Sequence, residues 1–415
     1  MSGSIKLKHA SGNGVIISAP SSNPAADRTL TLPSDADGVI AKTDASGNLT
    51  VEGNLNTSNI NGGQIGNRNL IINGAMNVAQ RGTASTATGY GSVDRFRIAT
   101  NSVDEAPTQA QVDVASGTEP YTKGFRKAFR ITNGNQTSGA GVVDTIHAIY
   151  QVEDQDLATS GWNYTDSNSF ITLSFYVKSS VAQNFFFFLQ SDNGSQYRYV
   201  METGSLSADT WTKITKKIEG NSNIVLNNDN GIGMYIVWPQ FDGTDRTGTR
   251  PLNAWAALDN TSRTPDQTST WYTTNDATWE ITGVQLEVGS VATEFEHRSI
   301  SQELALCQRY YYVHFPSGNG GKSFMNLTQY NFTYAYGHLQ FACTMRTAPS
   351  LDIVTGTNYY RSYGNNGASY LSTITMTTSH ENGCEVSVAT NRGTGSGCWF
   401  RAESANAQIA FNAEL

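Results

Sequence analysis

The 415-residue chain is poor in charge. Asp, Glu, Lys and Arg make up 15% of its residues, against about a quarter in typical globular domains. The net charge is −8 and no basic stripe occurs, which argues against nucleic-acid binding because phosphate contacts need clustered Lys and Arg. The first residues lack an apolar signal core, and the longest aromatic run, Phe185–Phe188, is too short to span a bilayer. We therefore expect synthesis and folding in a cytoplasm, without membrane insertion.

Cysteine is also scarce. The four residues Cys307, Cys343, Cys384 and Cys398 form no C-x-x-C pair, and none has a nearby His at zinc-finger spacing. Disulfide frameworks need denser cysteine than this. We expect buried free thiols rather than a metal or redox site.

The motifs of common catalytic centres are missing as well. There is no Gly-x-Ser-x-Gly elbow and no His-x-x-x-His zinc pair. Gly321–Ser323 ends like a phosphate loop, but Pro316 occupies the position of its first Gly, and strand-like residues follow. Glu153, Asp154 and Asp156 are candidates for an acid/base pair acting on a glycan. No second carboxylate motif accompanies them, so a solvated turn is favoured and no enzymatic activity is predicted.

One acidic loop is a candidate metal-binding site. Asp242–Asp245, together with Glu287, offers the oxygen ligands that Ca²⁺ prefers. Their spacing is not diagnostic of a calcium loop, and a metal-free turn is favoured. We predict no metal and no cofactor.

What the chain has in abundance is Gly, Ser, Thr and Asn, with 10% aromatic residues. This composition favours an all-β protein of short strands and polar turns. Apolar and polar residues alternate over 171–178 and again over 234–238, the pattern of half-buried strands. Turn clusters at 192–195 and 227–231 interrupt the chain at sandwich-like intervals. We predict a jelly-roll-like β-sandwich over residues 69–298.

A strand at 279–289 precedes the single predicted helix. Ser299 and Gln302 stand at the spacing of a capping box, so we assign residues 299–313 to a connecting helix. Its apolar side chains recur on one helical face, and no partner for that face is evident within the chain. The residues of this face are Ile300, Leu304, Cys307 and Tyr311.

Residues 1–68 read as very short strands joined by polar turns. Strand-like residues 5–7 and 15–17 flank an Asn-Gly turn, and 29–32 and 39–41 flank a second turn. So few apolar residues cannot offset the entropy of ordering the segment in a monomer, so we expect neighbouring chains to complete its sheets. Disorder is the alternative.

Residues 314–415 form a second predicted β body, rich in tyrosine. Ten of the 19 tyrosines lie from Tyr310 onward, mixed with Ser, Gly and Asn, a blend typical of binding loops. In the sandwich, the polar stretch 251–274 is expected to expose its tryptophans for stacking on a sugar, although most Trp are core residues. The candidate receptor contacts are Tyr359, Tyr360, Tyr363, Trp255 and Trp271.

Several stretches together resemble tail-fibre and related virion proteins of tailed bacteriophages, particularly those of marine and cyanobacterial hosts. Asn69–Gly82, followed by Asp94-Arg95-Phe96, looks like the opening strand of their sandwich domain. The other matching stretches are 28–40, 150–178, 281–311 and the closing strand 409–415. Residues 314 to about 405 do not share the resemblance, and in such fibres this distal region differs most.

The resemblance implies a homotrimer with the helix near its three-fold axis, so that the candidate trimer contacts are Ile300, Leu304, Cys307 and Tyr311. It implies attachment to a tail or baseplate protein through residues 1–40. It also implies a sandwich similar to carbohydrate-binding modules, and a distal tip at 314–415 that binds a host-surface glycan or protein. Such a protein is assembled in the host bacterial cytoplasm and resides in the virion tail. The candidate virion-attachment residues are Ile5, Leu7, Val15, Ile17, Leu30 and Leu32.

The leading hypothesis is a trimeric, non-enzymatic tail fibre with a receptor-binding tip. A depolymerase that cleaves host polysaccharide is a second hypothesis, because two carboxyl groups far apart in sequence can meet in space. A baseplate or adaptor protein without receptor contact is a third. The three differ in whether the chain binds glycan, cleaves it or does neither.

Overall fold

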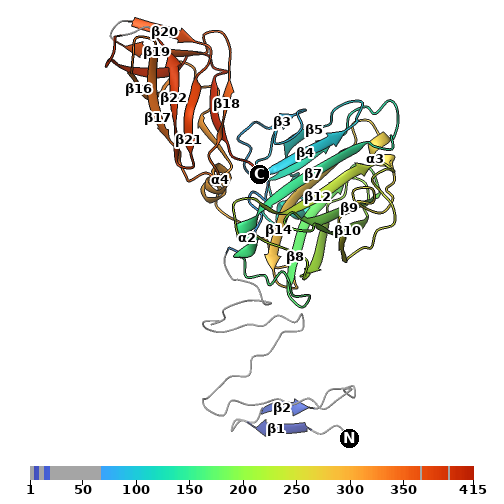
Figure 1. The fold of residues 1–415 in the computed structure, drawn as a ribbon. Helices are drawn as coiled ribbons and strands as arrows, with labels where there is room; N and C mark the ends of the chain where they lie inside the picture. Colours follow the sequence, from blue (N-terminus) through green and yellow to red (C-terminus); the bar gives the residue numbers. More distant parts are fainter. Residues whose placement is uncertain (1–3, 9–13, 19–66, 365–366, 391–392) are drawn as a thin grey trace. The chain divides into compact units, whose positions relative to one another are not determined.

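A computed structural model describes residues 4–8, 14–18, 67–364, 367–390 and 393–415 (Figure 1). The chain divides into two units, Met1–Thr57 and Ser58–Leu415, each considered by itself. In the first unit, β1 (Ser4–Lys8) pairs antiparallel with β2 (Gly14–Ser18).

The register of this pair places Ile5 opposite Ile17 and Leu7 opposite Val15. The first predicted hairpin is therefore confirmed. The second predicted hairpin, with Leu30 and Leu32, lies outside the described residues.

The region from residue 67 to 298 is a β-sandwich of two six-stranded sheets, within the described part of the chain. Its strands are β3 (Ala84–Ser85), β4 (Phe96–Asn101), β5 (Thr108–Asp113), β6 (Lys127–Thr132), β7 (Thr145–Glu153), β8 (Phe170–Ser179), β9 (Asn184–Ser191), β10 (Tyr197–Ser205), β11 (Thr212–Glu219), β12 (Ile232–Asp242), β13 (Trp255–Ala257) and β14 (Thr278–Val288). One sheet has the order β13-β10-β9-β12-β7-β4 and the other β11-β8-β14-β6-β5-β3. All pairings between these strands are antiparallel, which confirms the predicted sandwich.

The sandwich core lies between the two sheets and is formed by the inward-facing residues that the alternation predicts. Leu173 and Phe175 of β8 face Trp238 of β12 across this core, and Phe175 meets Trp238 edge-on with ring centroids 5.8 Å apart. The other face of β8 was expected to meet solvent or a ligand. Instead Tyr176 is 3% exposed, because Phe125 and its neighbours form a small second cluster over that face.

Four helices occur among the residues that the structure describes: α1 (Glu119–Thr122), α2 (Asp154–Ala158), α3 (Thr270–Thr273) and α4 (Ile300–Gln308). Only α4 was predicted, since the others have four or five residues and show no apolar periodicity. Its capping box is present: Gln302 N donates to Ser299 Oγ at 3.3 Å, and Ser299 N donates to Gln302 Oε1 at 3.1 Å. No helix in the described ranges is long and apolar enough to cross a membrane.

The apolar face of α4 has partners in its own chain. Cys307 is fully buried and packs with Ile72 and Val78, which come from the first stretch of the sandwich, while Leu304 borders the same cluster. Tyr311 is 2% exposed. The expectation that Cys307 and Tyr311 contact other copies of the chain is therefore wrong, whereas Leu304 is only partly buried and its trimer contact stays a prediction. Ile300 stays 61% exposed.

The helix also ends earlier than predicted, at Gln308, and a strand begins at Tyr311. The strands of this C-terminal body are β15 (Tyr311–Phe315), β16 (Ser323–Gln329), β17 (Tyr334–Gln340), β18 (Ser350–Val354), β19 (Tyr360–Gly364), β20 (Gly367–Leu371), β21 (Thr375–His380), β22 (Gly383–Ala389), β23 (Gly397–Ala402) and β24 (Gln408–Asn412). They form a three-stranded sheet, β15-β24-β18, and a seven-stranded sheet, β20-β19-β23-β16-β17-β22-β21. The predicted second β body is confirmed, and Gly321–Ser323 leads into strand β16 rather than a helix.

An ion pair and a hydrogen bond to the buried Glu153 join the sandwich to the segment that follows α4. Arg309, just after α4, contacts Glu153 at the end of β7 with 2.5 Å between Nη2 and Oε1. Tyr310 also donates its hydroxyl to Glu153 Oε2 at 2.5 Å. Glu153 is 1% exposed and Asp154 is fully buried. The solvated turn expected at these carboxylates is wrong, because Glu153 meets Arg309 and Asp154 accepts from the backbone N–H of Asn227.

Candidate functional site

The outward face of the seven-stranded sheet carries aromatic and basic side chains in neighbouring rows. The hydrophobic core of the C-terminal body is called the distal core. Along β23, Cys398 and Phe400 point into this core and are buried, whereas Trp399 between them is 56% exposed. This follows from the alternation of strand side chains between the two faces of a sheet. Trp399 is therefore displayed on the surface by the same strand that supplies the core.

Strand pairing places Tyr363 of β19 directly opposite Trp399 of β23. Their ring centroids are 6.1 Å apart and their planes are inclined by 31°. In the same register Arg361 lies opposite both Arg401 and Tyr370. The result is a platform of two adjacent rings with guanidinium groups along one side.

A hollow of about 630 Å³ lies on this platform. Tyr363 and Trp399 supply its aromatic wall, and Asn326 and Thr328 of β16 supply exposed polar groups. Its lining residues are Asn326, Leu327, Thr328, Tyr363, Gly364, Gly397, Cys398 and Trp399. We call this the distal platform.

The guanidinium groups beside the distal platform are held in place by one carboxylate. Glu403 Oε1 lies 2.5 Å from Arg401 Nε and 3.7 Å from Arg361 Nη1. The hydrogen bond from Arg401 lowers the pKa of Glu403, and the same bond raises the pKa of Arg401. Both guanidinium groups also lie over Tyr363, at 4.3 and 4.6 Å from its ring centroid. Two cations against one anion leave this edge of the platform positively charged.

Of the three predicted tyrosines, only Tyr363 lies on the distal platform. Tyr359 is partly buried against the distal core. Tyr360 is fully buried, and its hydroxyl donates to the carbonyl oxygens of Val354 and Gln408. The prediction that Tyr360 contacts a receptor is therefore wrong, because β19 turns alternate side chains inward.

The predicted sandwich tryptophans do not form an exposed surface either. Trp271 is fully buried and donates its indole N–H to Thr278 O, so its predicted exposure is wrong. Trp255 is half-buried against the sandwich core, with its N–H donated to Glu219 O. The polar residues around both rings suggested exposure, whereas tertiary packing covers them. The exposed tryptophan that the sequence analysis missed is Trp399.

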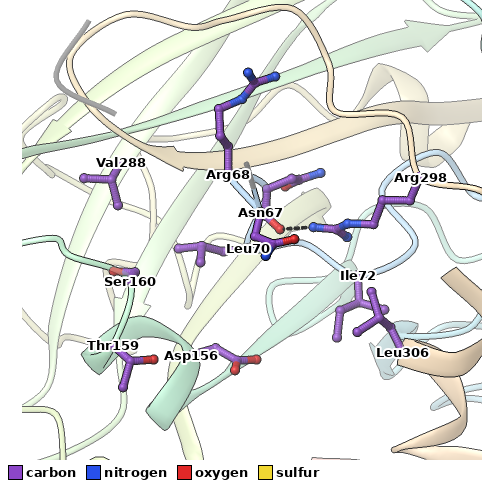
Figure 2. A pocket seen from close by; sticks show the side chains of 11 residues that line it. Asn67, Arg68, Leu70, Ile72, Asp156, Thr159, Ser160, Val288, Arg298 and Leu306 are labelled. Carbon is purple, nitrogen blue, oxygen red and sulfur yellow. Dashed lines mark hydrogen bonds between the residues drawn. The ribbon is translucent and has the colours of Figure 1, made fainter. Parts of the chain in front are cut away.

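A second hollow, of about 410 Å³, lies where the described part of the sandwich begins (Figure 2). Arg298 donates to the carbonyl oxygens of Asn69 and Ile71, and Arg68 donates to Glu294 O. Both guanidinium groups therefore donate to backbone carbonyl oxygens of their own chain. Figure 2 shows Asp156 on the opposite wall, where burial raises the pKa of its carboxyl group.

The carboxylates considered for calcium have protein partners. Asp242 Oδ1 lies 2.8 Å from His147 Nε2 and 3.2 Å from Arg263 Nη1. Glu287 accepts from the backbone N–H and the hydroxyl of Thr293. Across the described ranges, no group of three or more His, Cys, Asp or Glu side chains is arranged to hold a metal ion.

No protein-family model and no curated protein matches the chain. Among solved structures it is similar to the enzymatically active domain of tailspike protein 4 of bacteriophage CBA120, with 8% identity, a TM-score of 0.28, and coverage of 53% of this chain and 21% of that one. It is also similar to a putative sugar binding protein from Bacteroides thetaiotaomicron, with 13% identity, a TM-score of 0.27, and coverage of 53% and 99%. A family 11 carbohydrate-binding module from Clostridium thermocellum shows 10% identity, a TM-score of 0.23, and coverage of 51% and 98%.

The chain thus spans about a fifth of the tailspike chain. At these identities and TM-scores none of the likenesses bears on what this chain does.

Proposed function

We propose that the chain is a tail fibre of a tailed bacteriophage that binds a host-surface glycan through the distal platform. The observation that carries the proposal is the pair Trp399 and Tyr363, two rings held side by side on an outward sheet face. A 56% exposed tryptophan in the middle of a strand contributes little to the core. Its placement is explained by a ligand that stacks on it.

Sugars suit this surface chemically. The apolar C–H face of a pyranose stacks on aromatic rings, while its hydroxyl groups need hydrogen-bonding partners around the rings. Asn326, Thr328 and the guanidinium groups of Arg361 and Arg401 provide such partners within or beside the hollow. The hollow of about 630 Å³ lies within the range of small-ligand sites.

The fibre role is supported by the sequence stretches that resemble tail fibres, including 69–82 and 281–311. In this role the chain is a homotrimer attached by residues 1–40 to a tail or baseplate protein of the virion. Three weak glycan sites per fibre, repeated over several fibres, raise avidity through effective concentration. Light scattering that finds a monomer contradicts the trimer.

The test is binding of the purified chain to an array of bacterial surface polysaccharides and to intact bacteria. We expect Trp399→Ala and Tyr363→Ala to weaken binding at least tenfold, which corresponds to about 1.4 kcal/mol. Phe332→Ala is the matched control, since Phe332 is 69% exposed in the same body but does not line the hollow. Unchanged binding by both platform variants contradicts the site, and a purified chain that binds neither the polysaccharides nor the bacteria favours an adaptor role.

Binding without cleavage is part of the proposal. Glu153 and Asp154 are buried in contacts with Arg309 and Asn227, which leaves them unsuited to acid/base chemistry on a polysaccharide. We expect no reducing ends to be released when the chain is incubated with a polysaccharide that it binds. Sustained release of reducing ends establishes a depolymerase instead.

A further inference from the structure

A groove of about 160 Å³ lies on the sandwich, on the outward face of the sheet that contains β7, β9, β10 and β12. Its floor is apolar: Phe188 and Val237 line it and belong to a small buried cluster on this outward face. Its rim is polar, with Tyr235, Gln190 and Asn260 among the lining residues. We call this the sandwich groove.

Arg198 of β10 lines the sandwich groove although it is only 2% exposed. Its guanidinium lies over the ring of Phe188, 4.4 Å from the centroid. Its Nε and Nη2 both donate to Gln190 Oε1, at 3.2 and 2.7 Å, and it also donates to Asp259 O at 3.1 Å and to Asn260 Oδ1 at 3.3 Å. All three acceptors are neutral amide or carbonyl oxygens, so the buried cation has no anionic partner among them.

The nearby carboxylates are engaged elsewhere. Asp242 contacts Arg263 and His147, and Asp259 accepts from the backbone N–H and the hydroxyl of Thr261. In the described part of the chain, no carboxylate forms an ion pair with Arg198. Burial, followed by the charges of Arg250 and Arg263, lowers the pKa of Arg198 to about 9.

The charged groups that act on Arg198 and on Tyr235 of the groove are, with Arg198 itself, four guanidinium groups and three carboxylates, an excess of one positive charge. They are Arg97, Arg198, Arg250 and Arg263, and Asp192, Asp242 and Asp259. A buried cation without a counter-ion is unfavourable, and an anion that enters the groove removes that penalty. Asp242 balances Arg263, and the single carboxylate of Asp259 acts on both Arg198 and Arg250, so one positive charge beside the groove is left unbalanced. A monoanion matches it better than a phosphate dianion.

We propose that the sandwich groove binds the carboxylate of an acidic saccharide, a uronic acid unit, through Arg198. Four of the five guanidinium N–H groups of Arg198 already donate to protein oxygens, so the carboxylate accepts from the remaining Nη1 N–H and is otherwise attracted by the charge of the guanidinium. Strand register places Gln190 between Arg198 and Tyr235 on three adjacent strands. The sugar ring attached to the carboxylate then lies toward Tyr235, with the amides of Gln190 and Asn260 available to its hydroxyl groups.

This site is separate from the distal platform, because the two lie on different sheets with no shared residue. The experiment is calorimetric titration of the full chain with trigalacturonate, trimannuronate and triguluronate. Each is compared with its neutral methyl ester, which keeps the sugar backbone. We expect at least one acid to bind at least tenfold more tightly than its ester, and Arg198→Gln to abolish that preference. Trp399→Ala serves as the control and should retain it.

Equal affinity for acid and ester, or no binding of any of the three acids by the wild-type chain, overturns the proposal. This comparison needs no variant, so it stands even where Arg198→Gln fails to fold. Loss of acid binding in Trp399→Ala, with Arg198→Gln unaffected, assigns the acid to the distal platform and likewise overturns it. The acid-against-ester titration tests the sandwich groove and not the distal platform. Its outcome therefore does not depend on whether the tail-fibre proposal holds.

Discussion

Arg95 of the sandwich and Glu414, two residues beyond β24, form a buried ion pair with 2.5 Å between Nη1 and Oε2. Their side chains are 1% and 5% exposed. Glu414 Oε1 also accepts from Arg81 at 3.1 Å, and the Arg95 guanidinium lies 3.5 Å from the ring centroid of Tyr310. Two cations from the sandwich thus converge on one carboxylate of the C-terminal body.

Glu414→Gln should lower the free energy of unfolding by about 3 kcal/mol, because it leaves two buried guanidinium groups without their anion. Urea unfolding followed by circular dichroism measures the change. Glu294→Gln is the control: its partner Lys123 and Glu294 are 46% and 78% exposed, so the loss should be under about 1 kcal/mol. Equal losses in the two variants contradict the prediction.

Asp94 should make stability depend on pH. Burial raises the pKa of its carboxyl group from 3.8 to about 6, although hydrogen bonds from Gln80 oppose this. A group whose pKa is raised by folding contributes stability below the unfolded pKa, and this contribution is lost as pH rises through the folded pKa.

Between pH 4 and pH 6, Asp94→Asn should therefore gain about 2 kcal/mol of unfolding free energy relative to the wild type. The difference between the two proteins is the quantity to measure, by urea unfolding at several pH values, because other groups also titrate in this range. A difference that does not vary with pH contradicts the raised pKa.

Substitution of Trp271 should affect folding stability, whereas substitution of Trp399 should affect glycan binding. Trp271 is fully buried, so Trp271→Ala should lower the unfolding free energy by about 3–5 kcal/mol. Trp399 is 56% exposed, so Trp399→Ala should change it by less than about 0.5 kcal/mol while weakening glycan binding. Thermal unfolding and glycan titration of both variants check this, and a strongly destabilised Trp399→Ala would refute the assignment of its ring to a binding surface.

Helix α4 should show two different effects on its two faces. Leu304→Asp introduces a charge beside the cluster of Ile72, Val78 and Cys307, so we expect a loss of folding stability in each chain. Ile300→Glu alters a side chain that is 61% exposed, so we expect unchanged folding and weaker self-association.

Sedimentation measures the association, and thermal unfolding measures the stability. Val354→Glu, at a 41% exposed position of β18, serves as the surface control for Ile300→Glu. An Ile300→Glu protein with unchanged self-association removes α4 from the trimer contact.

The fold class, the sandwich and α4 could be predicted because each leaves a local pattern. Alternation marks β8 and β12, and the Ser299–Gln302 spacing marks the start of α4. The residues that cover an apolar face cannot be predicted in this way. Cys307 meets residues more than two hundred positions earlier, and nothing in the local pattern distinguishes this contact from one with another chain.

The site was predictable only in part. Tyr363 was singled out for its polar surroundings, and the same reasoning failed for Tyr360 and Trp271, which tertiary packing buries. Trp399 went unnoticed beside Phe400, since two adjacent aromatic residues look like core. Only the period of two along β23 separates them, placing Phe400 inside and Trp399 outside. The charge imbalance around Arg198 depends on side chains from several strands and loops, so no single stretch reveals it.

The alternation along β19 and β23 also separates outward side chains, which can be substituted, from inward side chains, which the distal core requires. Phe400 and Tyr360 are held by the distal core, whereas the ring of Trp399 and the amide of Asn326 touch little of it. Substitutions at outward positions therefore leave the unfolding free energy almost unchanged. If the distal platform binds glycan as proposed, its specificity can change residue by residue on β16, β19 and β23 while every intermediate still folds.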